Sequence, residues 1–465
     1  MPGLRQQQIR KLQESDLDVL VLGGGINGAG VLRDLALRAR FANAPLRIGL
    51  IEQNHFSSGT SGKNSQLIHG GLRYLKYLQI PLVRESLRER AILLRIAPQF
   101  VTPLPFLLPM YGLGARLKYG LGLWLYDRLA GAERIATHRM LDAAQVAQLE
   151  PELARDGLTA GAIFHDGAVL SARFVVENIL NAIEHGAFAA NYIAAQRWER
   201  GTDGLWTVSC RDAIAGEDFE LRTRKVVDAR GAWSGEGLRL VRGSHIVLSR
   251  LNAGDHAIAH FEPGGRIVFI IPWGSHNQLT LVGTTDVDHG GSPDDVHISN
   301  AEREYLLEVI GKLYPSRAGV QPISTFSSLR PLAAGHAGSA TSASRGHRIW
   351  NSADGILHIA GGKYTTYRLM SEEATDLLCR EIAPALDAVH RTADAPFAPV
   401  DRKIGDCLEQ RLTDYLYVTT YLGYEQPPAA DWLLPLARDL GAKLGWNPAQ
   451  IEQEVNAAIT SFQKP

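Results

Sequence analysis

The first fifty residues alternate between apolar runs and a helical pattern. Residues 17–23 (LDVLVLG) and 46–52 (LRIGLIE) are predominantly apolar, which is typical of parallel strands buried on both faces. Between them, residues 28–41 have helical periodicity with small residues on one face. A strand, a glycine turn, a helix and a second strand in this order open a doubly wound α/β sheet.

The middle of the chain changes to a different pattern. Residues 205–210 and 218–224 alternate apolar and polar positions, as strands with one wet face do, whereas residues 225–233 (KVVDARGAW) return to the buried parallel type. Further strands are predicted at residues 244–248, 266–272 and 279–283, and helices at 299–313 and 371–382. We interpret the later strands as a mixed sheet that forms a second layer.

The most apolar stretch of the chain is residues 100–125. Pro103, Pro105 and Pro109 exclude one continuous helix there, so a buried strand followed by a packed helix is predicted. The alternative is a surface that dips into a lipid leaflet. No run of about 18 apolar residues exists, which excludes a spanning helix. After Pro399 the pattern turns helical, which indicates a small separate domain.

Length and composition narrow the class of protein. A chain of 465 residues is expected to form two or three domains, and its net charge of −1 argues against a nucleic-acid carrier. Three distant cysteines without CxxC spacing indicate no disulfide framework, no metal site and a reducing compartment. The first fifteen residues have no apolar core, so no secretory signal is expected.

A glycine motif follows the first predicted strand. Gly23, Gly25 and Gly28 satisfy GxGxxG: the first makes the turn, the second lets the backbone approach a pyrophosphate, and the third permits helix–strand packing. The phosphate charge would then meet a helix N-terminus. Glu52 ends the next strand, where an acidic side chain can accept hydrogen bonds from ribose hydroxyls. The sequence therefore predicts a dinucleotide site.

Two later segments favour FAD over NAD. Residues 226–233 (VVDARGAW) match a late strand-and-glycine element that many FAD-binding folds place beside the cofactor. Residues 358–368 (HIAGGKYTTYR) predict a strand, a Gly-Gly turn and a helix start, which would aim a second helix N-terminus at the flavin. A nicotinamide enzyme has no need of such a late turn.

Several motifs carry a resemblance to a known family. They are GGGING, SQLIHGGLRYL, RGSHIV, IPW, GTTD, SLRPL and GGKYTTYR, in this order between residues 15 and 370. In this set the chain resembles the FAD-dependent glycerol-3-phosphate dehydrogenases. The resemblance implies oxidation of sn-glycerol 3-phosphate to dihydroxyacetone phosphate, with hydride passed to flavin N5 and electrons to a membrane quinone. It also implies a homodimer that contacts the membrane peripherally. The expected location is the cytoplasmic face of the inner membrane, or the cytoplasm.

The implied fold is α/β: a Rossmann-like FAD-binding domain of the glutathione-reductase or D-amino-acid-oxidase type, a mixed-sheet substrate domain and a short helical C-terminal domain. We expect the FAD-binding domain to comprise residues 1–85, 161–235 and 346–395. The expected insertion is residues 86–160, the substrate domain 236–345 and the helical domain 396–465.

The resemblance also implies the site residues. Non-titrating cations suit a phosphorylated substrate, and the matched positions supply Arg73, Arg330, Arg345 and Lys363. Tyr74 is expected to hydrogen-bond substrate, or to be a core tyrosine. The proton acceptor is expected to be His69, with His245 as the alternative. The expected cofactor contacts are Gly23, Gly25, Asn27, Gly28, Glu52, Thr60, Ser61, Ser65, His69, Gly70, Gly231, Trp233, Gly361, Gly362, Lys363 and Thr365.

The chain departs from the family at three places. Ser65–Gln66 replaces a Ser-Lys or Thr-Lys pair, a loss for which Lys63 is the candidate substitute, and residues 228–231 read DARG where Asn-Ala-(Thr/Ala)-Gly is usual. The C-terminal domain is also short. Two alternatives therefore stay open: a relative that uses oxygen or acts on another small hydroxy acid or amine, and a flavoprotein without turnover.

Overall fold

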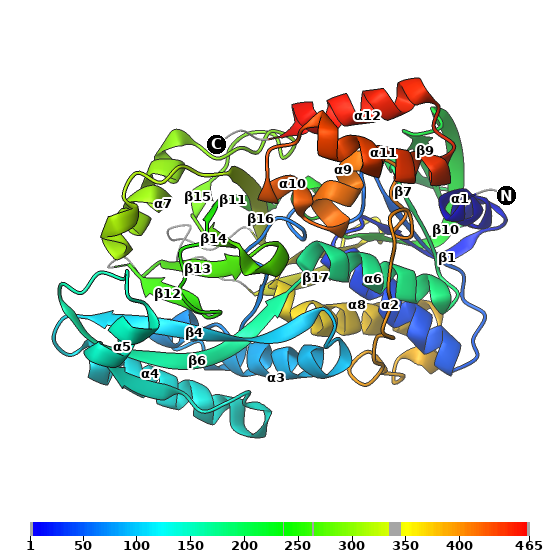
Figure 1. Cartoon of the computed structure of the whole chain (residues 1–465). Helices are drawn as coiled ribbons and strands as arrows, with labels where there is room; N and C mark the ends of the chain where they lie inside the picture. The colour runs from blue at the N-terminus through cyan, green and yellow to red at the C-terminus, as the bar shows by residue number, and fades with distance from the viewer. Residues whose placement is uncertain (1–2, 236, 263–264, 334–345, 463–465) are drawn as a thin grey trace.

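The computed structural model describes residues 3–235, 237–262, 265–333 and 346–462, and Figure 1 shows two β-sheets with helices packed around them and a helical tail. The two predicted buried strands are confirmed as β1 (Leu17–Leu22) and β2 (Ile48–Glu52), joined by α2 (Ile26–Phe41). β1 lies inside the first sheet with parallel neighbours on both sides, so Val19 and Leu20 are fully buried. The doubly wound opening is therefore confirmed.

The first sheet has the order β17-β18-β10-β1-β2-β7, and β9 and β8 extend it from β10. Its other strands are β7 (Phe188–Asn191), β8 (Ile193–Arg200), β9 (Trp206–Asp212), β10 (Glu217–Asp228), β17 (His347–Asn351) and β18 (Leu357–Gly361).

β10 is one strand where the pattern predicts two. From Glu217 to Thr223 it pairs antiparallel with β9, and from Thr223 to Asp228 it pairs parallel with β1. The first half therefore has a wet face, whereas Val226 and Val227 in the second half are fully buried. The change of pattern marks a change of environment, and the strand continues through it.

Three helices lie side by side on the first sheet (Figure 1): α2 packs against both α6 (Ser171–Glu184) and α8 (Tyr367–Ile382), while α1 (Leu4–Gln13) packs against β7. The predicted helix 371–382 begins earlier, at Tyr367, because the 3₁₀ turn η6 (Tyr364–Thr366) leads directly into it. The other main helices are α3 (Ile80–Ile96), α4 (Ala115–Ala130), α5 (Ala143–Leu149) and α7 (Asn300–Leu313).

The second sheet has the order β15-β11-β14-β13-β12-β4-β6-β3, with β16 paired to β11 and β5 to β6. Its strands are β3 (Leu67–Ile68), β4 (Val101–Tyr111), β5 (Arg139–Asp142), β6 (Leu158–Val169), β11 (Leu238–Ser249), β12 (Ala257–Phe261), β13 (Ile267–Trp273), β14 (Leu279–Gly283), β15 (Val287–Asp288) and β16 (Ser324–Ala333). The later strands predicted from the sequence thus form one sheet, which β4 joins by parallel pairing with β12.

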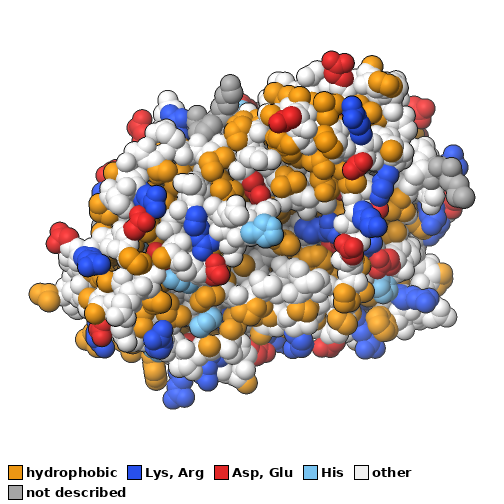
Figure 2. Space-filling model, viewed as in Figure 1, with side chains coloured by type: hydrophobic (Ala, Val, Ile, Leu, Met, Phe, Trp, Pro, Cys, Tyr) orange, Lys and Arg blue, Asp and Glu red, His pale blue; other side chains and the backbone are white. Residues whose placement is uncertain are grey.

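The apolar stretch at residues 100–125 forms β4 and then α4, as predicted, but α4 is packed on one face only. Leu117, Leu121 and Trp124, spaced as one helical stripe, are 79%, 64% and 51% exposed. Figure 2 shows hydrophobic side chains among Lys and Arg side chains along the lower edge, where α4 lies in Figure 1. In the part of the chain that the structure describes, no helix is long and apolar enough to cross a membrane.

The tail is helical, as predicted. It comprises α9 (Leu412–Asp414), a π-helix η8 (Tyr415–Thr419), α10 (Leu422–Glu425), α11 (Ala430–Leu444) and α12 (Pro448–Ser461). Its helices share a small apolar cluster of their own, formed by Leu412, Leu416, Leu433, Ala437, Val455 and Ala458. The expected Pro-Pro break lies between α10 and α11.

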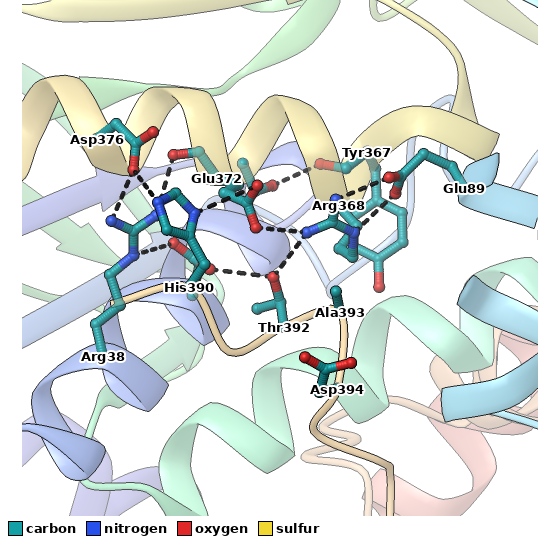
Figure 3. Close-up of polar contacts among 12 residues, drawn as sticks. Arg38, Glu89, Tyr367, Arg368, Glu372, Asp376, His390, Thr392, Ala393 and Asp394 are labelled. Carbon is teal, nitrogen blue, oxygen red and sulfur yellow. Dashed lines mark hydrogen bonds and ion pairs between the residues drawn. The ribbon is translucent and has the colours of Figure 1, made fainter. Parts of the chain in front are cut away.

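A buried ionic network fixes α8 to its neighbours (Figure 3). Arg368 donates to both carboxylate oxygens of Glu89 on α3, at 2.8 and 2.7 Å, and to Glu372 at 2.7 Å. One turn further along α8, Asp376 lies 2.7 Å from Arg38 on α2. Buried charges are tolerated when they are paired and hydrogen-bonded, so this network holds α8 in one position relative to the cavity described next.

Candidate active site

A cavity of about 340 Å³ lies where the carboxyl ends of β1 and β2 meet the second sheet. Ligands of open α/β sheets bind at this end of the strands. One side of the cavity is lined by Gly23, Gly25 and Glu52, and the other by residues of β11 and β16. Except for Gly28 and Gly70, every predicted site residue that the structure describes lines it. Arg345 lies outside the described residues.

The glycine turn after β1 is required by its backbone. Gly23 has φ +108°, and a Cβ there would lie 2.7 Å from the carbonyl oxygen of Ala229. A Cβ on Gly28 would lie 2.0 Å from the carbonyl oxygen of Gly23. Gly28 therefore permits α2 to pack on the turn, as the motif predicts, and does so from behind the cavity wall rather than in it.

Glu52 braces this turn. Its Oε2 accepts a hydrogen bond from the Gly24 N–H at 2.6 Å, and its Oε1 accepts one from the Asn54 N–H at 2.9 Å. Burial raises the pKa of this carboxyl, whereas the two N–H donors lower it. The side chain lines the cavity and keeps lone pairs for the hydroxyls of a ribose.

The residues at this end fit FAD. Gly25 is the N-cap of α2 without a capping side chain, so the first turn of α2 faces the cavity through backbone N–H groups. Ser61 accepts the N–H of Ile26 at 2.9 Å, and Thr60 donates to Leu329 O, which joins this loop to the second sheet. A diphosphate at the helix N-terminus and a ribose at Glu52 match this set of donors and acceptors.

The second predicted nucleotide-facing turn is present. β18 ends at Gly361 and is followed by Gly362, with φ +74° and +80°, before η6 and α8 begin. Lys363 and Thr365 follow and line the cavity. The Thr365 hydroxyl accepts the backbone N–H of His69 at 3.2 Å, which joins this turn to the loop before Arg73.

Two of the predicted substrate cations meet at one carboxylate. Arg330 donates to Asp286 Oδ1 at 2.7 Å and to Thr284 Oγ1 at 2.8 Å. Arg73 Nη1 lies 3.9 Å from Asp286 Oδ2. Sequence reasoning quoted the GTTD motif but gave Asp286 no role. The signal was available, because two arginines in a cavity need a carboxylate to hold them near each other.

Lys363 comes from the other side of the cavity. Its ammonium donates to Ser86 Oγ at 2.9 Å and lies 4.0 Å from the centroid of the Tyr74 ring. Tyr74 is 6% exposed and belongs to the main apolar core, which supports the alternative of a core tyrosine that positions Lys363.

The two candidate histidines differ in environment. The His69 ring is half-buried in the cavity wall, 6.3 Å from the ring of Phe269. His245 is 2% exposed, and its Nε2 is 2.8 Å from Ser65 Oγ. Burial, and then the charge of Arg330, lower the pKa of His245 to about 3, so its ring is neutral at physiological pH.

Sequence reasoning missed the group that holds the His69 loop. Asp166 Oδ1 accepts from the Gly70 N–H at 3.1 Å, from Arg90 Nη1 at 2.6 Å and from the Tyr126 hydroxyl at 2.8 Å. A Cβ on Gly70 would lie 2.3 Å from the Tyr126 hydroxyl oxygen. Gly70 is therefore needed for packing behind the cavity. It does not line the cavity, although it was predicted as a cofactor contact. A lone carboxylate in the apolar strand β6 was the signal, because it needs a buried partner.

The departures from the family pattern are accommodated locally. Arg230 and Asp228 pair with each other, Nη2 to Oδ2 at 2.8 Å, and the guanidinium lies over the Trp198 ring. Lys63 lines the cavity, and burial lowers the pKa of its ammonium. At the rim, Trp233 Nε1 donates to Asp294 at 2.7 Å after the positive-φ Gly231.

Comparisons with known proteins agree with this geometry. Residues 18–368 match the family described as FAD dependent oxidoreductase. The aerobic glycerol-3-phosphate dehydrogenase of Staphylococcus saprophyticus is 33% identical over 398 residues, 82% of this chain and 70% of that protein. The glycerol-3-phosphate dehydrogenase of Synechocystis is 37% identical over 401 residues, 79% and 70% respectively.

The fold is similar to that of a solved structure, the glycerol-3-phosphate dehydrogenase from Bacillus halodurans complexed with FAD. The TM-score is 0.73 at 22% identity, and the match covers 98% of this chain and 96% of that one. The expected fold class is thus confirmed, as is the expected family. The chain belongs to the FAD-dependent oxidoreductases and, within them, to the glycerol-3-phosphate dehydrogenase family.

Proposed function

We propose that this chain oxidises sn-glycerol 3-phosphate to dihydroxyacetone phosphate. Bound FAD supplies the two-electron acceptor, which takes the hydride at N5. The observation that carries the proposal is the pairing of Arg330 and Arg73 on Asp286 in a cavity whose other end fits a dinucleotide. The names of the relatives support the same substrate.

The cations bind the phosphate in this proposal. Arg330 presents a planar fork whose donors suit phosphate oxygens, and Asp286 sets its orientation by a 2.7 Å hydrogen bond. Lys363, the residue before η6, adds a point charge that is positioned by Ser86 and the Tyr74 ring. A polar phosphorylated substrate is thereby oriented with its carbon chain toward the histidines.

The hydroxyl proton passes to His69 in this proposal. Its ring is open to the cavity, and the hydrogen bonds that the N–H groups of residues 69 and 70 donate to Thr365 and Asp166 fix the loop that carries it. His245 is the second candidate. Its lowered pKa makes it a weak base, and it gains basicity only if the substrate phosphate offsets the charge of Arg330.

Anaerobic bleaching of the flavin tests the activity. Addition of glycerol 3-phosphate to the FAD-loaded protein should remove the flavin's visible absorbance, and dihydroxyacetone phosphate should appear in equal amount. Glycerol or a small hydroxy acid at the same concentration should bleach it far more slowly. A flavin that stays oxidised with glycerol 3-phosphate would exclude the proposal and favour a flavoprotein without turnover.

The electron acceptor of this proposal is a membrane quinone, reached from a surface that includes α4. The stripe Leu117, Leu121 and Trp124 is exposed, and Arg116 and Lys118 flank it. Apolar side chains beside basic ones suit the boundary between acyl chains and anionic head groups. This supports the alternative that the sequence left open for residues 100–125.

Vesicle flotation tests this surface. The double variant Leu117→Asp with Trp124→Asp should lose binding to anionic vesicles and keep its activity with a soluble dye acceptor. Leu170→Asp is the matched control, because Leu170 is 48% exposed before α6 rather than on α4. Hydrogen peroxide formed in step with substrate loss would indicate oxygen as the acceptor instead. The homodimer remains part of the proposal, to be checked by sedimentation.

A further inference from the structure

A second cavity, of about 300 Å³, lies between the loop Asn54–Lys63 and the tail helices. The loop separates it from the large cavity: Asn54, Ser57, Ser58 and Lys63 line both. Ligand sites occur preferentially where two parts of a fold meet. Nothing in the proposed oxidation uses this space.

His55 offers an unused donor here. Asn191 Nδ2 donates to Leu408 O at 2.8 Å, which fixes the orientation of the amide, and it lies 2.6 Å from His55 Nδ1. Nδ1 is therefore the acceptor and Nε2 carries the hydrogen. His55 is 2% exposed, and among the described residues its Nε2 has no hydrogen-bond partner. Such a buried donor is costly unless a ligand satisfies it.

Ser57 and Lys63 add two more donors on the same wall. Ser57 is 3% exposed, and its Oγ has no partner in the described part of the chain. No hydrogen bond or ion pair within those residues is made by the Lys63 ammonium, whose pKa burial lowers. Three unsatisfied donors, one of them cationic, call for a ligand with acceptor oxygens.

Among the described residues, the one carboxylate that lines this cavity is Asp414 of α9, and it does not supply those oxygens. Asp414 accepts from the Tyr192 hydroxyl at 2.6 Å and from the backbone N–H groups of Gln410 and Arg411 at 2.9 and 3.0 Å. These donors occupy both of its oxygens, and its 3.9 Å contact with His55 is to Nδ1, which leaves His55 Nε2 without a partner among the described residues. The donors of the loop therefore remain available for a ligand.

The opposite wall is largely apolar. Tyr417 and Val418 come from the π-helix η8, and Tyr424 comes from α10. Single-turn π-helices occur frequently at functional sites. An aromatic wall facing a wall of donors suits a ligand with a flat or apolar body and an anionic group.

The position of the cavity argues against a ligand taken up from the membrane. The tail helices lie at the edge of the molecule opposite α4 (Figure 1), which is the proposed membrane surface. We propose that this second cavity binds a small water-soluble organic anion, a carboxylate or a phosphate monoester, whose oxygens accept from His55, Ser57 and Lys63. Because one loop forms a wall of both cavities, the flavin senses the occupant.

Titration of the FAD-loaded protein with benzoate and, separately, phenyl phosphate tests the proposal without turnover. At millimolar concentrations one of the two probes should raise the melting temperature and perturb the flavin absorbance. A response to benzoate identifies the anionic group of the ligand as a carboxylate, and a response to phenyl phosphate identifies it as a phosphate. Ser57→Ala should weaken that binding at least tenfold, since it removes a hydrogen bond to a charged group. Ser461→Ala is the matched control, because Ser461 lines the same cavity but donates to Ala458 O.

Two further variants separate this site from the substrate site. Thr413 lines the second cavity and not the first, so Thr413→Phe should fill only the second. This variant should abolish the response, and it tests the proposal even if Ser57→Ala fails to fold. Arg330→Ala should leave the response unchanged. No response from the wild-type protein, or a response lost with Arg330→Ala and kept with Thr413→Phe, would overturn the proposal. Either failure leaves the oxidation of glycerol 3-phosphate untouched.

Discussion

The two ends of the large cavity are built by different means. The nucleotide end is made by two glycine turns, one at Gly23–Gly25 and one at Gly361–Gly362, which act mainly through backbone geometry and backbone N–H groups, while Glu52 braces the first. The substrate end is made by side chains from separate segments, such as Arg73 and Arg330, which a carboxylate holds together.

This difference predicts how substitutions at each end affect ligand binding. A backbone turn leaves no room for a Cβ, so a substitution there should abolish binding altogether. A set of side chains that share one substrate loses its affinity in steps. The four predictions below test this contrast, beginning with the complete loss expected at the glycine turn.

Gly28→Val should give the largest effect. Its Cβ would lie 2.0 Å from the carbonyl oxygen of Gly23, which is backbone and cannot move aside. The variant should purify without flavin, as measured by absorbance near the visible flavin bands. Gly122→Ala is the control, since no atom lies within 4 Å of its added Cβ. A yellow, active Gly28→Val protein would contradict the claim that the glycine turn tolerates no side chain.

Arg330→Ala should give a graded loss. Charge-assisted hydrogen bonds are worth roughly 1.5–3 kcal/mol each, so kcat/KM for glycerol 3-phosphate should fall about tenfold to a few hundredfold. The loss should largely vanish with glycerol, which has no phosphate. Arg317→Ala, at an exposed pair with Glu152, should change neither rate. An equal loss with both substrates would assign Arg330 to the fold or the flavin.

His69→Asn should impair both substrates alike. A general base contributes roughly a hundredfold or more, and free hydroxide replaces part of it as the pH rises. The measurement is kcat/KM against pH for glycerol 3-phosphate and glycerol. Normal turnover in His69→Asn, together with this defect in His245→Asn, would move the proton acceptor to His245.

His245 should also make the protein sensitive to acid. Its pKa is about 3 in the folded state and near 6.5 in the unfolded chain, so the unfolded state binds more protons between these values. The contribution of the neutral His245 ring to the free energy of unfolding is fully present above about pH 6.5 and is lost as the pH falls toward 3. Between pH 7 and pH 5, the melting temperature of His245→Gln should therefore fall by a few degrees less than that of the wild type. His297→Gln, at an exposed histidine, should match the wild type.

The same contrast explains what could be predicted from the sequence. The nucleotide end follows from local spacing, because Gly23 and Gly28 meet within one turn of chain. The apolar runs at β1 and β2 are equally local, since their burial on both faces needs no knowledge of distant partners.

The substrate end needed the three-dimensional fold. Asp286 meets Arg330 and Arg73 only because β16 pairs with β11 and the loop after β3 reaches the same wall. Likewise, Asp166 meets the Gly70 N–H across β6, a contact between residues 96 positions apart. The resemblance to the family pointed to the arginines, and residue type marked the two carboxylates as needing partners, but which groups they pair with depends on contacts between distant segments that no spacing in the sequence sets.

The long strand β10 has a consequence for synthesis on the ribosome. Its last residues, Val227 and Asp228, pair with Leu357 and His358 of β18, which leave the ribosome more than a hundred residues later. Until then the nascent chain carries an open strand edge beside an unfinished flavin site, and open edges invite pairing with other chains. Premature termination before β18 should therefore give aggregates rather than a smaller flavoprotein, so the chain is indivisible as a folding unit up to that strand.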